Sequence, residues 1–361
     1  MNQHIIAPRF TQSVLRTAPS RFRAAQQPFI ATVRTKLETG AYRFEATRCP
    51  CGTDASSITI AAIDRYGLPL TSVLCTACGT IRFDPYLDSA SLQDFYRQYY
   101  QQMYGRSDDV DAYFAKQRAY GQRLLQAYAA SLAPHTTVVE IGCGAGGALA
   151  EFHARGFQVA GCDYSAELID AGGERGVTGM VVGDVAALQA KHPVLKANLV
   201  LLHHVFEHVE DPLEVLRACA AIVAPEGRIV IAVPNVDAID RFVYPAGDLL
   251  EFLHIAHKYN FTRDGISAVA AQAGFASVEP PAQLLRLSAR LVAPELWVEL
   301  QRADTSHGSA RPALLQGSGA ARLHYLRRTE RLHALGLCVG QFRYRLQWLT
   351  PAGVLRRLRS K

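Results

Sequence analysis

The sequence lacks any stretch that could cross a membrane as a helix, although 49% of its 361 residues are hydrophobic. No uncharged run approaches the roughly 20 residues that such a helix needs. The first residues also lack the basic, apolar and small-residue regions of a secretory signal peptide. These absences lead us to expect a cytoplasmic protein without a transmembrane segment.

Acidic side chains are missing from the first 37 residues, which hold six Lys or Arg residues. We interpret residues 1–40 as a basic leader, either flexible or docked on the surface. An organellar transit peptide is the alternative for such a composition. Internal repeats and low-complexity blocks are also absent, and the length allows two domains with tails.

Cysteine is too sparse for a disulfide scaffold, with eight residues in the whole chain. Four of them nevertheless form two short pairs, Cys49 with Cys51 and Cys75 with Cys78, and glycine follows each pair. Two turns of this kind can present four thiolates tetrahedrally to zinc. We expect a structural zinc in a module of short strands over residues 41–86. The first pair is C-x-C instead of the common C-x-x-C, and two loops with reduced thiols are the alternative.

The most informative motif is E-I-G-C-G-A-G-G at residues 140–147, where an apolar strand ends in an acid and a glycine-rich turn follows. Glycine lets the backbone approach a ligand closely, and a helix starting near Gly147 would direct its free N–H groups at that ligand. The turn also satisfies the dinucleotide fingerprint G-x-G-x-x-G, which recurs by chance. Glu140 favours a ligand with a cationic amino group over a dinucleotide, because a buried carboxylate needs a partner of that kind.

Two later strands also end in acids. Asp163 closes the run 157–163 about 20 residues after the turn, the position from which a carboxylate holds ribose hydroxyls. Asp184 closes a short apolar run that begins at Met180. With Glu140, the three acids describe a pocket for a methionine amine, a ribose and an adenine. The alternative is that they cap helices on an unrelated doubly wound sheet.

These motifs, with Phe206-Glu207-His208-Val209-x-Asp211-Pro212 and the run from Gly227 to Asn235, resemble class I S-adenosylmethionine-dependent methyltransferases. The resemblance implies that Glu140 faces the methionyl end of the cofactor, Asp163 the ribose, and Asp184 with Val185 the adenine. It implies S-adenosylmethionine as the cofactor, bound also by Gly142, Gly144, Gly146, Tyr164 and His203.

The expected fold class is α/β, with a doubly wound, seven-stranded Rossmann-like sheet over residues 135–302. Asp211-Pro212 predicts a helix start, because a capping acid precedes a proline at the first helical position. Residues 276–302 should supply the last two strands, with 296–301 antiparallel. The segment 236–262 interrupts the alternation and should lie over the methyl donor, because ligands bind beyond the carboxyl ends of parallel strands.

Two flanking regions complete the predicted organisation. Residues 87–134 are predicted to form a helical lid or linker, because aromatic residues recur there at helical spacing. Among them, Tyr99, Tyr100 and Tyr104 are candidates to contact the acceptor or the cofactor. Ordinary core packing is the alternative. Residues 303–361 form a basic helical extension, with ten Lys or Arg residues against the single acid Glu330 from Ala321 onward. Three interpretations are open for this extension. It is a solvated helix face, or it binds anionic groups of membrane lipid or of a pyrophosphate-linked substrate, or it binds RNA.

The candidate catalytic residues are His208, His204 and Glu207, which follow the fourth strand at spacings that place them on one helical turn. Either histidine could take a proton from an attacking hydroxyl, with His208 first and His203 turned away. Alternatively, this turn merely orders the loop. Some quinone-biosynthesis methyltransferases bind a divalent metal with a cluster that His204-x-x-Glu207-His208 resembles imperfectly.

A small zinc module ahead of a methyltransferase core resembles enzymes that methylate nucleotide-linked sugars or surface glycans. The expected acceptor is therefore a sugar, a nucleotide-sugar or a glycan, which could be lipid-linked. An RNA methyltransferase, a quinone-type small-molecule methyltransferase and an NAD-dependent sugar oxidoreductase are the alternatives. Nucleic acid is the less favoured partner, because no RNA-binding module motif occurs.

Overall fold

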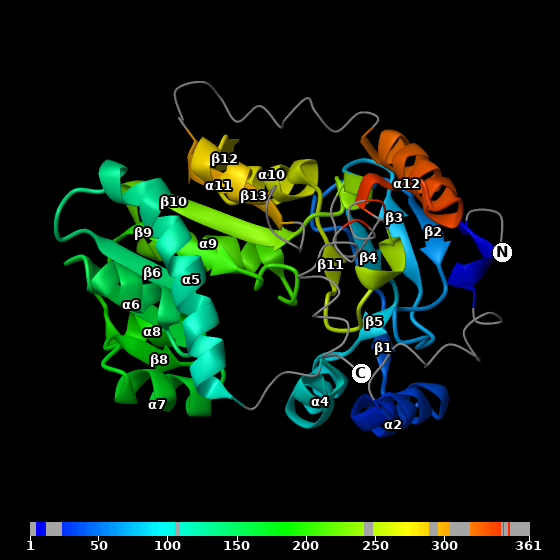
Figure 1. The fold of residues 1–361 in the computed structure, drawn as a ribbon, viewed down its shortest axis with the longest axis horizontal. Coiled ribbons are helices and arrows are strands. Elements are labelled where there is room, and N and C mark those ends of the chain that lie inside the picture. Colours follow the sequence, from blue (N-terminus) through cyan, green and yellow to red (C-terminus); the bar gives the residue numbers. More distant parts are fainter. Residues whose placement is uncertain are drawn as a thin grey trace.

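A seven-stranded sheet forms the centre of the larger half of the molecule (Figure 1). The computed structural model describes residues 5–11, 24–104, 109–241, 248–288, 295–303 and 318–340, together with Phe342 and Leu346. The strands lie in the order β12-β13-β10-β9-β6-β7-β8. Their bounds are β6 (Thr137–Ile141), β7 (Gln158–Asp163), β8 (Met180–Val182), β9 (Ala197–His203), β10 (Val223–Pro234), β12 (Phe275–Val278) and β13 (Glu295–Arg302).

The sheet is mostly parallel, as expected. Strand β13 alone among these strands runs antiparallel to both of its neighbours, β10 and β12. This confirms the antiparallel direction predicted for residues 296–301. Strand β6 pairs with both β7 and β9, so the chain reverses its direction of winding at the strand that carries the glycine turn. In open α/β sheets, that reversal opens a crevice beyond the carboxyl ends of the strands, where ligands bind.

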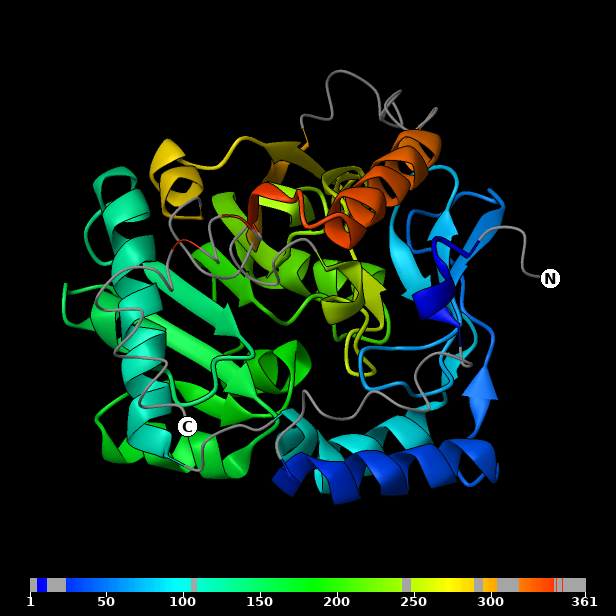
Figure 2. The same cartoon turned by 45° about the vertical axis from the view of Figure 1, so that its right-hand side comes forward.

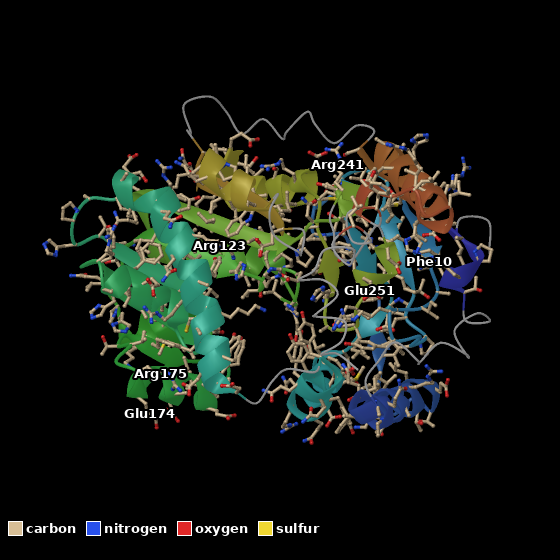
Figure 3. All side chains as sticks on the ribbon, in the orientation of Figure 1. Phe10, Arg123, Glu174, Arg175, Arg241 and Glu251 are labelled. Atoms are coloured by element: carbon tan, nitrogen blue, oxygen red, sulfur yellow. The ribbon has the colours of Figure 1, made fainter. Side chains whose placement is uncertain are left out.

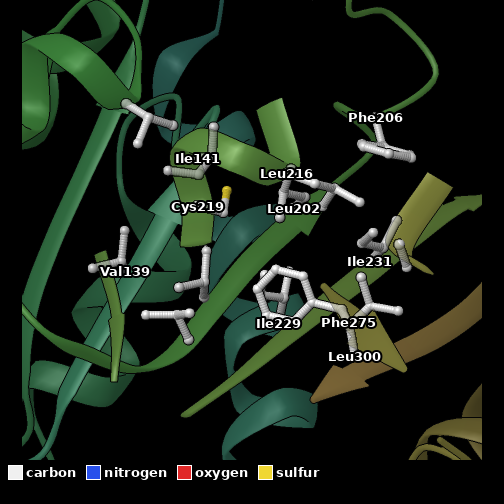
Figure 4. Packing of buried hydrophobic residues seen from close by; sticks show 14 of the residues in the cluster. Val139, Ile141, Leu202, Phe206, Leu216, Cys219, Ile229, Ile231, Phe275 and Leu300 are labelled. Atoms are coloured by element: carbon white, nitrogen blue, oxygen red, sulfur yellow. The ribbon is translucent and has the colours of Figure 1, made fainter. Parts of the chain in front are cut away.

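Helices cover both faces of the sheet, because the side chains of each strand alternate between two apolar clusters. Val138 and Leu201 pack on one face, and Val139 and Leu202 on the other (Figure 4). The first face is covered by α5 (Val110–Tyr128), α6 (Gly147–His153), α7 (Ala166–Glu174) and α11 (Ala282–Ser288). The second is covered by α8 (Val185–Lys191), α9 (Pro212–Ile222) and α10 (Arg263–Gln272). Helix α9 starts as predicted, with Asp211 accepting from two backbone N–H groups.

A smaller sheet in the order β11-β4-β3-β2 forms the second half. Its strands are β2 (Ser57–Ala61), β3 (Ser72–Cys75), β4 (Ile81–Phe83) and β11 (Tyr259–Asn260), and β1 (Phe44–Glu45) pairs separately with β5 (Tyr86–Leu87). Strand β11 comes from the segment 236–262, so the interruption noted in the sequence adds a strand to the small sheet. Asp64 fixes the same segment by accepting from the Ile255 N–H at 3.1 Å. The two halves are therefore joined through this segment.

Short helices complete the small half. They are η1 (Pro8–Phe10), η2 (Ala24–Gln26), α2 (Gln27–Glu38), α3 (Ser89–Phe95), the π-helix η3 (Tyr96–Tyr100), α4 (Gln101–Tyr104), η5 (Ile239–Arg241) and η6 (Leu249–Glu251). The short helix η4 (Ala129–Ser131) instead follows α5. Part of the basic leader is docked: Phe10 is fully buried (Figure 3), and Ile6 N–H donates to the Ile60 carbonyl at 3.1 Å. Residues 12–23 of that leader lie outside the described part of the chain.

Helix α12 (Ser318–Ala334) packs against β3 of the small sheet and against η5 (Figure 2). Its start is fixed there, because a Cβ at Gly319 would lie 2.3 Å from the Thr76 carbonyl oxygen and Ser318 donates to the Ala77 carbonyl at 2.6 Å. The predicted helical character of the basic extension thus holds for residues 318–334, while 304–317 and 347–361 are outside the described residues. No helix in the described ranges is long and apolar enough to span a membrane.

Candidate active site

The glycine turn after β6 requires glycine at three positions. Gly142, Gly144 and Gly146 have φ values of 69°, 53° and 73°, in the left-handed region that side chains disfavour. The N–H groups of Gly142 and Cys143 both donate to the Cys162 carbonyl, at 2.8 and 3.0 Å, which fixes the turn to the end of β7. Helix α6 then begins at Gly147, as predicted, with its first N–H groups at the crevice.

Helix α5 closes one side of this turn. Gln117 Nε2 donates to the Cys143 carbonyl at 2.7 Å, and Gln117 Oε1 accepts from the Gly147 N–H at 3.4 Å. A Cβ at Gly144 would lie 2.7 Å from the side chains of Gln117 and Tyr113. The helix is held in place by the Arg118–Glu151 ion pair at 2.5 Å and by the Arg175–Asp111 pair. The sequence reasoning missed Gln117, because a single glutamine on an amphipathic helix carries no distinguishing pattern.

Glu140 meets the expectation of a buried acid at a strand end. The residue is only 3% exposed, and its Oε2 has no hydrogen-bond partner among the described residues. Burial, with a smaller contribution from Asp163, raises the pKa of Glu140 well above its ordinary value. A buried carboxyl group without a partner is costly unless a ligand supplies one. The amino group of a methionyl ligand fits this donor requirement.

The other two acids also make bonds within the fold. Asp163 accepts from the Gly144 N–H at 2.8 Å and from the Ser165 N–H at 2.9 Å. Asp184 accepts from the Ala187 N–H at 3.0 Å and so caps α8, as the alternative interpretation held for these acids. Val185 is buried, whereas Tyr164 is 80% exposed beside Asp163. Each carboxylate can accept further hydrogen bonds, so the bonds within the fold leave room for a ligand. The contacts of Asp163 to ribose and of Asp184 to adenine stay predictions.

Alternating imidazoles and carboxylates lie at the carboxyl end of β9. His203 Nε2 lies 3.3 Å from Glu295 Oε1, and His204 Nε2 lies 3.4 Å from the same atom. On its other side, His204 Nδ1 lies 3.2 Å from Glu207 Oε1. Residue His204 adopts a φ of 54°, which is unusual for a side chain other than glycine and turns the chain sharply after the strand. We call these residues, with His208 and His257, the histidine cluster.

His208 extends this cluster toward the small half of the molecule. Its Nδ1 lies 3.0 Å from the Tyr96 hydroxyl, and its Nε2 lies 3.8 Å from Glu207 Oε1. The His257 ring packs edge-on against His208 with centroids 4.7 Å apart. Glu207 Oε2 and His257 Nδ1 are buried without a hydrogen-bond partner in the described part of the chain. These unpaired atoms identify the cluster as a place where a ligand would complete the bonding.

The protonation states of the two candidate bases differ. Burial by itself would lower the pKa of His204. The hydrogen bonds to Glu207 and Glu295 have the larger effect and raise this pKa to about 10. For His208, burial dominates the attraction of Glu207 and lowers the pKa below its ordinary value of 6.5. Despite burial, the hydrogen bond from His204 lowers the pKa of Glu207 to about 2. At neutral pH, His204 is therefore a cation and His208 a neutral imidazole.

The structure thus brings together the three residues predicted as catalytic, His204, Glu207 and His208. His203 was expected to be turned away from these residues. It instead joins them by contacting Glu295, and its ring stacks on Tyr120 with centroids 3.6 Å apart. Of the candidate tyrosines, Tyr100 lies 6.2 Å from the His208 ring and Tyr104 lies 5.4 Å from His254, whereas Tyr99 lies beside Lys36 of α2. Glu295 and Tyr96 were not singled out from the sequence.

Two triads in this region have the spacing of metal ligands. Their ligand atoms lie within 4.8 Å of one another in each triad, the first made of His203, His204 and Glu295, the second of Glu207, His208 and His257. Either set of two imidazoles and one carboxylate could accept a divalent cation. The geometry therefore keeps the metal alternative open beside the proton-transfer one.

The four cysteines of the two short pairs lie together. Their sulfurs are within 4.8 Å of one another, with Cys49 and Cys78 at 3.5 Å and Cys51 and Cys75 at 3.8 Å. Gly52 and Gly79 have φ values of 72° and 74°, so both turns use the glycine that follows the cysteines. Four thiols in this spacing fit a closed zinc site. The turn that carries Cys49 and Cys51 packs against α10, since Gln272 donates to the Pro50 carbonyl at 2.9 Å.

Comparison with known proteins finds similarity to methyltransferases over the part of the chain that holds this site. Residues 113–279 match the model of the methyltransferase domain, a range that contains the glycine turn, the three strand-end acids and all of the histidine cluster except Glu295. Ubiquinone biosynthesis O-methyltransferase of Serratia proteamaculans is 36% identical over 104 residues, which are 27% of this chain and 43% of that protein. The same enzyme of Xanthomonas campestris is 35% identical over 108 residues, 28% of this chain and 44% of that protein.

The chain spans less than half the length of these curated relatives. Among solved structures, the plantazolicin methyltransferase BpumL in complex with SAH is 16% identical and has a TM-score of 0.40, covering 59% of this chain and 94% of that chain. The mitomycin 7-O-methyltransferase MmcR is 20% identical with a TM-score of 0.40, covering 59% of this chain and 67% of that chain.

Proposed function

We propose that the protein is an S-adenosylmethionine-dependent methyltransferase that methylates a hydroxyl group of a sugar or glycan acceptor, with His208 as the base. Residues 113–279, which match the model of the methyltransferase domain, support the reaction type. One observation carries the proposal. The histidine cluster directly adjoins the glycine turn, because a Cβ at Gly142 would lie 2.3 Å from the Val205 side chain. A base and a methyl donor bound at the turn would therefore share one crevice.

The donor site is argued from the three acids. Glu140 would hold the methionyl ammonium with its unpaired carboxyl oxygen, and the bound ammonium would return the carboxyl to its ionised form. Asp163 would accept from the ribose hydroxyls, and Asp184 with Val185 would border the adenine. Bound S-adenosylmethionine supplies a methyl group on a sulfonium, and the protein's task is to align an acceptor oxygen with that carbon.

His208 has a defined hydrogen-bonding state for proton removal. The Tyr96 hydroxyl donates to the Ala256 carbonyl at 3.1 Å, so its oxygen accepts from His208 Nδ1–H. The remaining nitrogen, Nε2, then carries the lone pair, and burial keeps the ring neutral at physiological pH. His208 Nε2 would take the hydroxyl proton as the oxygen attacks. His204, Glu207 and Glu295 would act as positioning residues, because His204 already holds its proton at neutral pH.

The acceptor side is walled by aromatic rings from the small half. Tyr100 and Tyr104 are in ring contact with each other, and His254 lies between Tyr104 and Tyr66. Flat faces with hydroxyl edges suit a sugar ring, whose C–H groups pack on aromatic faces while its hydroxyls take hydrogen bonds. These residues lie outside the range 113–279, apart from His254. The acceptor preference therefore rests on parts of the chain that the family match does not cover.

A second candidate acceptor is a ring hydroxyl of a quinone-type small molecule. The observation that favours it is the similarity to ubiquinone biosynthesis O-methyltransferases, which covers 27% of the chain. Such an acceptor would also pack against Tyr100 or Tyr104. In this version, a divalent cation held by Glu207, His208 and His257 could lower the pKa of the ring hydroxyl.

The deciding experiment incubates the protein with isotopically labelled S-adenosylmethionine and separate panels of nucleotide sugars, glycans, ring-hydroxyl compounds and RNA. Label transferred to a sugar hydroxyl supports the proposal, and label found only on ring hydroxyls replaces the acceptor by the second candidate. Repeating the productive reaction after chelator treatment and dialysis separates the two mechanisms. A base mechanism keeps its rate, whereas a metal mechanism loses it and regains it with added divalent cation.

The cysteine cluster is proposed as a structural zinc site that shapes the small half. A site with four sulfur ligands leaves no coordination position for a reactant, so its contribution would be to folding. Its thiols come from turns that pack on α10 and near α12, and Thr262 Oγ1 donates to the Cys78 carbonyl at 2.7 Å. Zinc would therefore stabilise the side of the acceptor crevice that β11 and its neighbours form.

A further inference from the structure

Helix α12 carries cations along its exposed face and ends in exposed apolar residues. His324, Arg328, Arg331 and Leu335 are all exposed and follow one another at spacings of four, three and four residues. Residues at these spacings lie on one face of a helix. Within the described part of the chain, no carboxylate forms an ion pair with Arg328 or Arg331. The cations of this face are therefore available to a partner.

The only acid of this helix is turned inward. Glu330 is buried and binds Arg9, with Arg9 Nε 2.5 Å from Glu330 Oε1. Arg9 also binds Asp248 at 2.8 Å, so this network fixes the opposite face of α12 to the N-terminal segment and to η6. Its charge is thus compensated inside the molecule. The outward face keeps a one-sided positive charge.

The apolar residues that follow the helix are concentrated. Leu335 is 71% exposed, and four more large apolar side chains are exposed within the next eleven residues: Leu337, Val339, Phe342 and Leu346. These make up five of the eleven exposed large hydrophobic side chains in the described residues. Such a concentration on a surface is unusual for a segment that faces only water. The adjacent sequence 347–361 adds four further Lys or Arg residues and no acid.

We propose that the exposed cations of α12 and the exposed apolar side chains that follow the helix form a docking surface for an anionic lipid bilayer. The apolar side chains are those of Leu335, Leu337, Val339, Phe342 and Leu346. Basic side chains beside exposed leucine and phenylalanine are the combination by which a peripheral segment lies at a membrane interface, where the cations meet lipid phosphates and the apolar groups enter the acyl boundary. RNA offers the same charge but no apolar phase for Leu335, Leu337 and Phe342. Helix α12, which carries the cations, packs against β3 of the small sheet (Figure 2), and the proposal does not rest on the proposed reaction.

The test is sedimentation of the full chain with vesicles of phosphatidylcholine alone or mixed with phosphatidylserine. We expect binding to the mixed vesicles that weakens as salt is added. The variant Arg328→Gln/Arg331→Gln should bind about tenfold or more weakly. The variant Leu335→Ser/Leu337→Ser should bind more weakly at every salt concentration, because apolar insertion is not screened.

Matched controls come from other exposed sites. Arg155→Gln/Arg217→Gln removes two exposed cations from the methyltransferase half, and Val194→Ser removes a side chain that is 90% exposed. Both controls should bind like the unchanged protein, and all variants should keep its melting temperature. Absence of vesicle binding, equal loss in the controls, or tighter binding to an RNA oligonucleotide than to the mixed vesicles would overturn the proposal. None of these readouts depends on methyl transfer.

Discussion

The donor side and the acceptor side of the crevice are assembled in different ways. The donor side consists of contiguous strand–turn–helix units, in which Glu140, the glycine turn and Asp163 follow one another along the chain. The acceptor side joins η3, the turn after β9, the segment 252–258 and the start of β13. A change on the donor side should therefore act on cofactor binding alone. A change on the acceptor side should act on the chemical step.

The largest effect is expected from Gly144→Val. Its φ of 53° disfavours any side chain, and the first added carbon would lie 2.7 Å from Gln117 and Tyr113. Calorimetry should detect no binding of S-adenosylmethionine. The control Gly173→Ala adds a Cβ that meets nothing within 4 Å in a helix, and it should bind normally. Wild-type affinity in the Gly144→Val protein would remove the glycine turn from the donor site.

The next effect belongs to the acceptor side. His208→Gln keeps a donor group for Tyr96 but removes the base, so the turnover rate should fall by about a hundredfold or more. Affinity for S-adenosylmethionine should stay nearly unchanged, because the base acts in the transition state. Unchanged turnover would move the search for the base to His257 and His254. A parallel loss of cofactor affinity would indicate that this turn only shapes the crevice.

The pH profile sharpens the same comparison. The base form of His208 exists above its pKa, which burial lowers from the ordinary value of 6.5. The rate of the unchanged protein should therefore be level above pH 6.5 and fall only in more acidic solution, as the ring becomes protonated. If His204 were the base, its pKa of about 10 would instead require alkaline solution for full activity. A rate that rises toward pH 10 would exchange the roles of the two histidines.

The sequence was informative where the relevant residues are neighbours along the chain. The glycine turn and the starts of α6 and α9 follow from local patterns of glycine, caps and apolar residues. Glu295 could not be found in this way, because it lies 91 residues from His204 and reaches it only through the return of β13 beside β10. Tyr96 meets His208 across 112 residues, through packing between the two halves. Pairing of β11 with β4 was equally hidden, since two residues carry no strand pattern of their own.

The cysteine cluster offers a test that lies outside both sides of the crevice. Elemental analysis of the purified protein should find about one equivalent of zinc, and Cys75→Ser/Cys78→Ser should lose it. Loss of the metal should lower the melting temperature, while S-adenosylmethionine binding persists at temperatures where the protein stays folded. A matched control is Cys219→Ser, which changes a buried cysteine of α9 far from the pairs in sequence. Metal-free wild-type protein with full stability would contradict the zinc assignment.

The smallest effect is expected from Gln117→Ala. This change removes both hydrogen bonds between α5 and the glycine turn, to the Cys143 carbonyl and from the Gly147 N–H. Each such bond contributes about 1 kcal/mol, so the loss of both should lower cofactor affinity by at most roughly thirtyfold. The turnover rate at saturating cofactor should stay near the wild-type value, because in the described part of the chain Gln117 forms its hydrogen bonds with Tyr113, Cys143 and Gly147 and not with the histidine cluster. Gln122→Ala, at an exposed position of the same helix, is the matched control. A fall in turnover at saturating cofactor would show that α5 influences the acceptor side as well, and the separation between the two sides of the crevice would then fail at this helix.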